Sequence, residues 1–296
     1  MQRVWKTWYL TAKIVTSHRK LWIPFLMTAL VEASFLGCIW LAPQPPFSAV
    51  FAPPIRYFFG ERVLHYPAHL WFLYHAMKHT NLVASLLVGA FMTGVACAMV
   101  QQLHEGTPLS FRTALMSHQV RYRRVAFLWL IAWGIAKGSL ELAGRYAPKT
   151  IWMFWVLVTF TVVLQALLSY IIPAAVFERT SWWKALWHGV RESCQHPLST
   201  LLVVIGPSAL VITFAAIFSP ARLAQWMTHT TAPEIALVWT AVRLMVWTIA
   251  DALLTISIAH LWWLHRAPAY ASEVVKLTQP SAAVSRRRLQ ESSVVA

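Results

Sequence analysis

Long runs of apolar residues dominate the chain between residues 21 and 265. A helix that crosses a bilayer needs about 20 mostly apolar residues, because it rises about 1.5 Å per residue and unpaired backbone groups are costly in lipid. Six segments meet this requirement: residues 21–42, 80–101, 125–143, 151–177, 198–218 and 235–264. The pattern predicts an all-α, polytopic membrane protein in which residues 21–265 form a six-span membrane domain.

The N-terminal segment, residues 1–20, is amphipathic rather than uniformly apolar. Lys6, Lys13 and Lys20 recur every seven residues and so share one helical face, opposite the two tryptophans of this segment. A helix of this kind lies in the headgroup region with its apolar side down. We therefore expect an interfacial helix whose lysines contact anionic lipid.

Two connecting segments also carry apolar side chains at helical spacing. Thr180 and Ser181 can cap the helix in one segment, and Thr107, followed by Pro108, can cap the helix in the other. The stripes are Trp182, Ala185, Leu186, Gly189 and Val190 in the first, and Phe111, Ala114, Leu115, His118 and Tyr122 in the second. Each helix is expected either to lie on the membrane surface or to pack against the protein's own bundle.

Composition supports a membrane protein and excludes an ordinary soluble domain. Hydrophobic residues make up 58% of the chain, and charged residues make up 12%, about half of the ~25% usual in soluble domains. The net charge is +15. The cations lie between the apolar spans, so the expected partner is the anionic cytoplasmic leaflet, with a partner membrane protein as a second candidate, and not nucleic acid.

The distribution of cations predicts the orientation. Seventeen of the 25 Lys and Arg residues fall on one set of alternating connections and termini, and six fall on the other. Because Lys and Arg accumulate on the cytoplasmic side, both termini are predicted to be cytoplasmic. Residues 266–296 have no sustained apolar period and are predicted to be a disordered tail. The excess of Arg over Lys is typical of a bacterial genome, which favours the bacterial inner membrane.

The spans and their connections suggest an internal repeat. One unit, an inward span, a cytoplasmic amphipathic helix and an outward span, covers residues 80–143, and a second covers 151–218. The matching strings are Glu105-Gly106-Thr107 with Ala114-Leu115, and Glu178-Arg179-Thr180 with Ala185-Leu186. The last span and the N-terminal segments would supply a third unit, which predicts a pseudo-threefold bundle.

This motif, a span that ends in an acidic residue followed by an Ala-Leu helix that leads into another span, resembles a group of bacterial six-helix membrane proteins. The group includes the membrane-anchor domain of some glycerophosphodiester phosphodiesterases. The resemblance covers about residues 80–218, and Arg179 stands where the first copy has Gly106. It implies the fold and an inner-membrane location, but no activity, since no phosphodiesterase catalytic domain is attached.

Ionisable residues lie well within the predicted spans, at Glu32, Lys137, Glu141, Arg243 and Asp251. A charge at mid-membrane costs at least ~2.5–3.5 kcal/mol, so such residues usually face the interior and pair. The depth of each residue in the membrane follows from its distance along the span from the point where the span enters. These depths predict a cluster in which Arg243 contacts Glu141, with Glu32 or Asp251 as the acid nearer to the midplane. The cluster either fixes helix register or forms a proton or substrate relay.

The fourth and fifth spans carry polar and helix-breaking residues. Thr161, Gln165, Ser169 and Pro173 follow one another at i+4 spacing, and Gly206-Pro207 interrupts the fifth span. In the other repeat unit, Gly134 lies nine residues into the third span, as Pro207 does in the fifth. Helix breaks at matching positions of two repeats can mark a transporter site. The alternative is close helix packing by small residues, at Gly134 and Gly138 and along Ala90, Gly94 and Ala98, with proline as an ordinary residue of membrane helices.

Histidines gather between the first two spans. His75 and His79 are four residues apart and could share a metal if their segment is helical, but the surrounding aromatic residues also fit an interfacial helix. No nucleophile elbow, phosphate-binding loop or zinc-protease motif is present, and Cys38, Cys97 and Cys194 form no CxxC pair. We expect no cofactor or metal, and we favour a non-catalytic membrane subunit or scaffold over a permease for a small or amphipathic solute.

Overall fold

A computed structural model describes residues 2–66, 68–117, 121–146, 151–178, 181–217 and 234–266. These residues are all-helical and contain no strand. The longer helices are α1 (Gln2–Ser17), α2 (Ile23–Leu41), α3 (Ser48–Phe59), α4 (Ala68–Ala84), α5 (Ala90–His104), α7 (Tyr122–Tyr146), α8 (Ile151–Leu168), α10 (Trp182–Gln195), α11 (Pro197–Ile217) and α13 (Ile235–Arg266). Short elements are η1 (Arg19–Trp22), η2 (Glu61–Leu64), η3 (Ser85–Gly89), α6 (Phe111–Leu115) and α9 (Ile171–Phe177).

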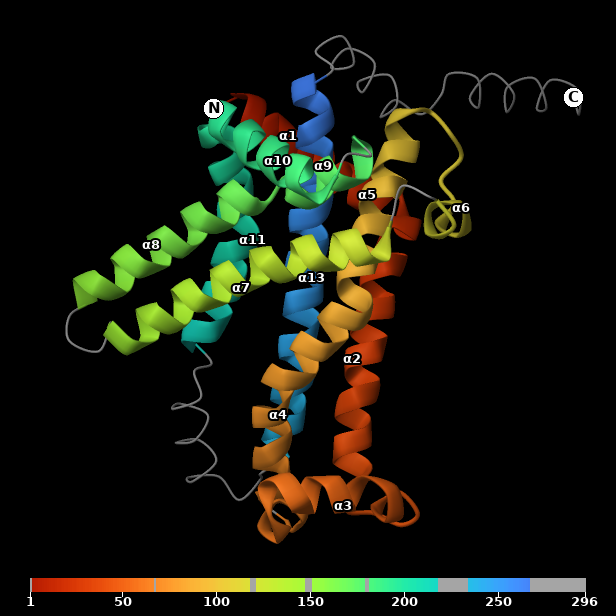
Figure 1. Ribbon diagram of the computed structural model, residues 1–296, viewed down its shortest axis with the longest axis vertical. Helices are drawn as coiled ribbons and strands as arrows, with labels where there is room; N and C mark the ends of the chain where they lie inside the picture. The colour runs from red at the N-terminus through yellow and green to blue at the C-terminus, as the bar shows by residue number, and fades with distance from the viewer. Residues whose placement is uncertain are drawn as a thin grey trace, which may run out of the picture.

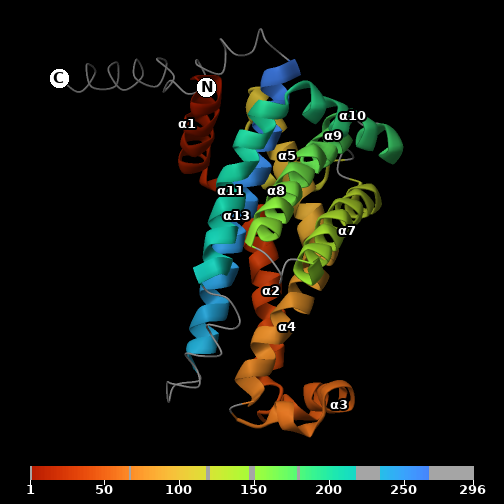
Figure 2. The ribbon, with the colours of Figure 1, turned by 90° about the vertical axis from the view of Figure 1, so that its left-hand side faces the viewer.

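Most long helices run along one axis of the molecule (Figures 1 and 2). The helices α2, α4, α5, α11 and α13 follow this axis, whereas α3 lies across one end. The helices α1, α6 and α10 gather at the opposite end, beside the C-terminal end of α13. The α7–α8 hairpin projects sideways from the bundle.

The helix α5 lies at the centre because its side chains are small. Ala90, Gly94 and Ala98 are all buried, which confirms them as a close-packing face. Small residues let neighbouring backbones approach, and α5 packs against α2, α9 and α13. By contrast, few of the side chains in the spans Arg19–Leu41 and Trp155–Phe177 are buried, as expected for helices that face lipid.

Five helices among the described residues are long and apolar enough to cross a membrane: Arg19–Leu41, His79–His104, Trp155–Phe177, Pro197–Phe214 and Ile235–His265. They correspond to five of the six predicted spans and fit a multi-pass membrane protein. The remaining predicted span, 125–143, lies within α7. The side chains of Ala136, Lys137 and residues 139–146 lie outside those that the structure describes.

The structure corrects the predicted helix between the second and third spans. Thr107 does not cap it: its hydroxyl instead donates to the carbonyl of Gln102 at 3.1 Å. The helix begins only at Phe111, after Ser110, whose Oγ accepts the N–H of Thr113 at 3.3 Å. The helix therefore begins after the last polar residue that can cap it before the apolar stripe. The helix α6 is only five residues long.

The predicted helix breaks have different outcomes. The chain leaves the helix at Ser169 and Tyr170, between α8 and α9, as expected from Pro173, which has no N–H to donate to the Ser169 carbonyl. In contrast, α11 continues through Gly206 and Pro207 without interruption, so the expected break there is wrong. The predicted disordered tail is residues 266–296, and all of it beyond Arg266 lies outside the residues that the structure describes.

Candidate functional site

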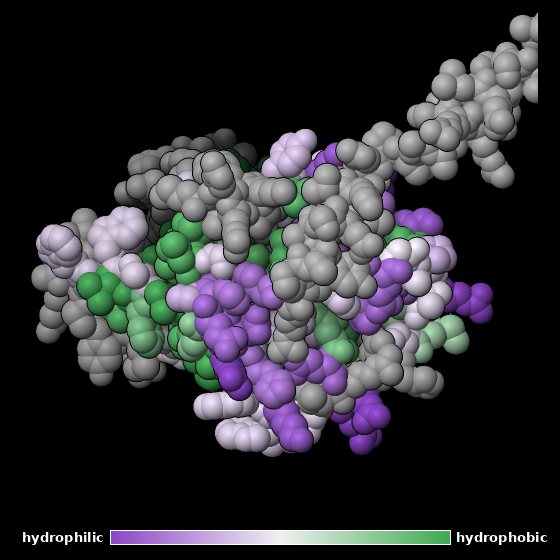
Figure 3. Space-filling model, turned by 90° about the horizontal axis from the view of Figure 1, so that it is seen from above, coloured by the Kyte–Doolittle hydropathy of each residue, from purple (hydrophilic) through white to green (hydrophobic). Residues whose placement is uncertain are grey.

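A basic cleft of about 510 Å³ lies at the end of the molecule that carries α1, α6 and α10. The residues that line it come from two segments: Ser17, His18, Arg19 and Lys20 from the α1–α2 junction, and Pro108 and Leu109 from the loop after α5. Figure 3 looks onto this end and shows hydrophilic residues over its middle and right. Hydrophobic residues show mainly at the left, where the α7–α8 hairpin projects.

The local sequence explains how the first wall forms. The backbone bends at His18, whose φ of −115° and ψ of 74° lie outside the helical region, and the chain then enters the 3₁₀ turn η1. Leu21 is completely buried in this turn and fixes it to the core, while Arg19 and Lys20 are exposed. Consecutive cations are therefore held at the point where the N-terminal helix turns into the first predicted span.

The second wall is held by Gln102 at the end of α5. Its carbonyl accepts the hydroxyl of Thr107 at 3.1 Å, and its side-chain Oε1 accepts the backbone N–H of Ser110 at 3.0 Å. These two bonds fix the loop that carries Pro108 and Leu109. The loop therefore presents a defined backbone edge to the cations across the cleft.

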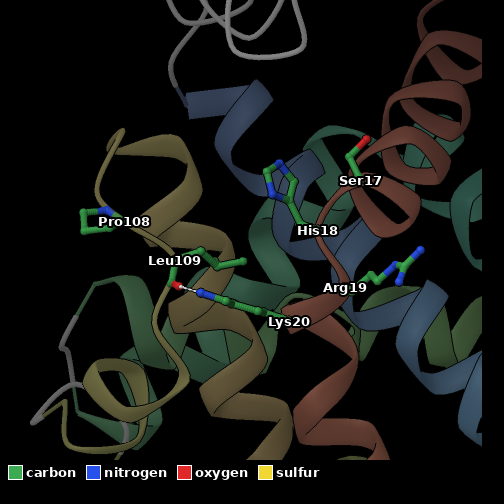
Figure 4. Close-up of a pocket in the computed structure, with 6 residues that line it drawn as sticks. All are labelled: Ser17, His18, Arg19, Lys20, Pro108 and Leu109. Carbon is green, nitrogen blue, oxygen red and sulfur yellow. Dashed lines mark hydrogen bonds between the residues drawn. The ribbon is translucent and has the colours of Figure 1, made fainter. Parts of the chain in front are cut away.

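Lys20 joins the two walls. Its Nζ donates to the carbonyl of Leu109 at 3.3 Å, as Figure 4 shows, while His18 points into the space above and Arg19 points to the other side. An ammonium group carries three N–H donors, so one bond to Leu109 leaves donors for a ligand. Among the residues that the structure describes, no carboxylate lines the cleft. The cleft can therefore bind an anion such as a phosphate group.

Only one of the three predicted lipid-surface lysines lies in this cleft. Lys13 is partly buried on α1, and the side chain of Lys6 lies outside the described part of the structure. The sequence analysis missed His18 and Arg19, which lie beside Lys20. The sequence feature that could have indicated them is the unbroken string His18-Arg19-Lys20 directly before the first apolar run.

A polar cluster lies inside the predicted spans. Glu32 is buried on α2, and both of its carboxylate oxygens accept from Nδ2 of Asn81 on α4, each at 3.1 Å. Arg243 and Asp251 on α13 lie within electrostatic range of Glu32. Asp251 is exposed although it lies halfway along α13. The structure thus brings three of the five predicted intramembrane charges together.

The other two predicted members of this cluster lie on α7. The side chains of Lys137 and Glu141 are outside the described residues, so the contact between Arg243 and Glu141 stays a prediction. The helix α7 packs mainly against α8, α5 and α9, whereas α13 packs mainly against α11, α1, α5, α2 and α4. The polar cluster that the structure describes therefore joins α2, α4 and α13, and Asn81 was not expected in it.

The polar stripe of the fourth span serves helix packing. Gln165 accepts from the hydroxyl of Ser208 on α11 at 3.2 Å, whereas the hydroxyls of Thr161 and Ser169 donate to carbonyls of their own helix. Pro173 is buried in α9. Trp8 of α1 covers Gly206, where an added Cβ would lie 2.5 Å from Cζ2 of the indole ring. Both features are contacts between helices.

The histidines between the first two spans have separate surroundings. His69 is buried, and its two ring nitrogens lie 3.2 Å from the Val63 carbonyl oxygen and 3.0 Å from the Trp40 carbonyl oxygen, so it ties α4 to α2. His75 and His79 both lie on the helix α4, as the metal hypothesis required. His79 is exposed, and the side chain of His75 lies outside the described residues. The three cysteines are free, as expected.

Comparisons with protein-family models, with curated proteins and with solved structures gave no match for this chain. Its function therefore has to be argued from its own residues.

Proposed function

We propose that this chain is a non-catalytic, multi-pass membrane subunit or scaffold whose basic end holds anionic lipid headgroups. The observation that carries the proposal is the cleft between the α1–α2 junction and the loop after α5. His18 and Lys20 face the cleft, Arg19 lies beside them and points to the other side, and no carboxylate is among the described residues that line it. A phosphate headgroup offers the charge and the acceptor oxygens that such a group of donors binds.

The proposed orientation agrees with the placement of the cleft. The segments that are rich in Lys and Arg, including α1, α10 and the end of α13, lie at one end of the molecule, and α3 lies at the other. We propose that the basic end faces the cytoplasm of a bacterial cell, with both termini on that side. The cleft then lies at the level of the anionic leaflet.

Two further proposals concern the architecture. A sixth span, formed by α7, would complete the bundle. Residues 80–143, with α5, α6 and α7, and residues 151–218, with α8 to α11, would then be two copies of a pseudo-threefold repeat shared with the six-helix anchor group named above. The projecting α7–α8 hairpin supports a subunit role, because it carries exposed bulky side chains away from the bundle. These include Trp152, Trp155, Val156 and Phe160 on α8 and Phe127 and Ile135 on α7.

The lipid proposal is tested by measuring which lipids stay with the purified protein. The chain is purified from bacterial membranes in mild detergent, and bound anionic and zwitterionic phospholipids are quantified by mass spectrometry. A hydrogen bond to a charged group contributes about 1.5–3 kcal/mol, so the double variant Arg19→Gln, Lys20→Gln should bind anionic lipid at least roughly tenfold more weakly.

The matched control is the double variant Lys184→Gln, Arg191→Gln, which removes two exposed cations from α10 at the same end of the molecule. It should retain bound anionic lipid nearly unchanged. An equal loss in both variants would show that the whole basic surface, rather than the cleft, attracts lipid. Unchanged lipid binding in the cleft variant would refute the proposal.

A permease for a small or amphipathic solute is the second candidate function. The observation in its favour is the polar cluster of Glu32, Asn81, Arg243 and Asp251 inside the predicted spans. Ionisable residues at such positions usually face a protein interior or a water-filled cavity and often lie on ion or substrate pathways. The carboxylate of Asp251, halfway along α13 and near that of Glu32, is the specific feature that a purely structural cluster does not need.

A further inference from the structure

A carboxylate and two imidazoles meet where the end of α10 packs near the end of α13. Glu192 and His196 are four residues apart at the C-terminal end of α10, and His265 is the second-to-last residue of α13. Oε1 of Glu192 lies 3.8 Å from Nε2 of His196 and 3.6 Å from Nδ1 of His265. One ligand atom from each residue lies within 4.8 Å of the other two.

The local sequence fixes this arrangement. His196 follows the last residue of α10, its backbone N–H donates to the Glu192 carbonyl at 3.2 Å, and α11 begins with Pro197. The chain therefore turns at His196, and the imidazole stacks on His265 with ring centroids 3.7 Å apart and an interplanar angle of 28°. The stack places both imidazoles against the same carboxylate.

The surroundings favour the neutral form of His196. Burial lowers the pKa of His196, the neighbouring His265 lowers it further, and Glu192 opposes them. Nδ1 of His265 is buried and has no hydrogen-bond partner among the residues that the structure describes. Buried polar atoms are nearly always satisfied, so such an atom calls for an explanation.

We propose that Glu192, His196 and His265 bind a divalent first-row transition-metal ion, with Zn²⁺ as the reference ion. Two imidazoles and a carboxylate are a common donor set for such ions, whereas Ca²⁺ and Mg²⁺ prefer sites made only of oxygen. Zinc bonds of about 2.0–2.2 Å give ligand separations of about 3.4 Å in a tetrahedron. The spacings of 3.6 and 3.8 Å are close to this separation. The two imidazoles also have to turn out of their stack, so that a nitrogen of each ring points at the same ion.

A simple ion pair explains these spacings less well. A charge-assisted N–H···O bond is about 2.7–2.9 Å long, and both imidazole–carboxylate distances exceed 3.5 Å. The side chain of Glu192 is only 8% exposed, that of His265 14%, and that of His196 41%. The partly exposed His196 side gives an ion a path from solvent and leaves room for a water ligand.

Metal binding here would have a structural effect. Glu192 and His196 lie at the junction of α10 and α11, and His265 lies at the end of α13. A shared ion would therefore join segments that are about 70 residues apart in the chain. It would hold the end of α13 against α10 and stabilise the folded protein, because a ligand that binds only the folded state shifts the unfolding equilibrium.

The proposal is tested with Co²⁺ and Zn²⁺ on the full chain in detergent, in a Cys194→Ser background, because the exposed Cys194 thiol on α10 could bind these ions itself. Bound metal is measured after dialysis, Co²⁺ by its visible absorption, and Zn²⁺ also by the shift of the melting temperature. The parent is expected to bind one ion per chain. Glu192→Gln and His265→Gln should each weaken binding at least about tenfold, since losing even an outer-shell partner commonly costs that much.

The chain supplies a closely matched control. Glu61 and His65 are also four residues apart, and their Oε1 and Nε2 atoms are also 3.8 Å apart, but no third ligand joins them. Glu61→Gln with His65→Gln should leave Co²⁺ and Zn²⁺ binding unchanged. If the parent binds neither ion, or if the control lowers binding as much as the site variants, the proposal is refuted. Glu192→Gln keeps the side-chain shape, so a folded variant with undiminished metal binding also overturns it.

Discussion

A close approach between helix backbones offers a direct test of the packing. Gly189 on α10 lies against the turn between α8 and α9. A Cβ added there would lie 2.8 Å from both Cα and N of Ile171 and 3.0 Å from the carbonyl carbon of Tyr170. All three are backbone atoms, which cannot rotate away as a side chain could. Gly189→Ala must therefore push α10 away from the turn.

The size of the effect follows from these distances. Carbon atoms pack at about 3.5–4.0 Å, so α10 must retreat by roughly 0.7 Å or more. Overpacking of this kind costs about 1–3 kcal/mol. Replacing a glycine inside a helix by alanine also stabilises the helix by about 1 kcal/mol through the higher helix propensity of alanine. Gly134 on α7 is the matched control, because a Cβ there meets nothing within 4 Å. Gly189→Ala should therefore be less stable than Gly134→Ala by about 1–3 kcal/mol.

The assay is unfolding in mixed micelles by titration with sodium dodecyl sulfate, followed by tryptophan fluorescence. The 17 tryptophans give a strong signal, and the free energies of unfolding of the two variants are compared at one lipid content. Hydrogen exchange should also show faster exchange in α10 for Gly189→Ala. Equal stabilities of the two alanine variants would refute the close approach of α10 to the turn.

Two further variants test other parts of the fold and site. Ser110→Ala removes the acceptor of the Thr113 N–H and should lower the local stability of α6 by about 1 kcal/mol, seen as faster exchange of the Thr113 amide, whereas Thr107→Ala should leave that amide protected. Glu32→Gln with Arg243→Gln removes a carboxylate and a cation together, so the double variant should stay folded and keep its bound anionic lipid. Proton flux into vesicles, followed with a pH-sensitive dye, then separates the two functions: flux that the parent shows and this folded variant lacks would favour a permease.

The sequence predicts much of the helical architecture because apolar runs and small residues act locally. The buried Ala90, Gly94 and Ala98 face of α5 and the buried Ala185 and Gly189 of α10 follow directly from helical spacing. The start of α6 does not, because Gln102 binds the hydroxyl of Thr107 and leaves the capping position to Ser110. That competition depends on a backbone carbonyl of the preceding helix.

Sites formed by distant residues were harder to find. The spacing of Glu192 and His196 was visible in the sequence, but His265 joins them only because α10 ends at the turn before Pro197. Similarly, Asn81 contacts Glu32, which lies 49 residues earlier in the chain. The depth of each residue along its own helix did not indicate this partner. Which helices become neighbours depends on packing between spans, and hydrophobic periodicity carries little information about that.

The contact between Trp8 and Gly206 has a consequence for biosynthesis. The helix α1 precedes α11 and α13 in the chain, so it leaves the ribosome before the surfaces against which it packs. Because domains assemble as the chain emerges, α1 has to wait while the intervening helices are synthesised. Its docking onto Gly206 is then a late step, and it occurs only in molecules in which α11 is already in place.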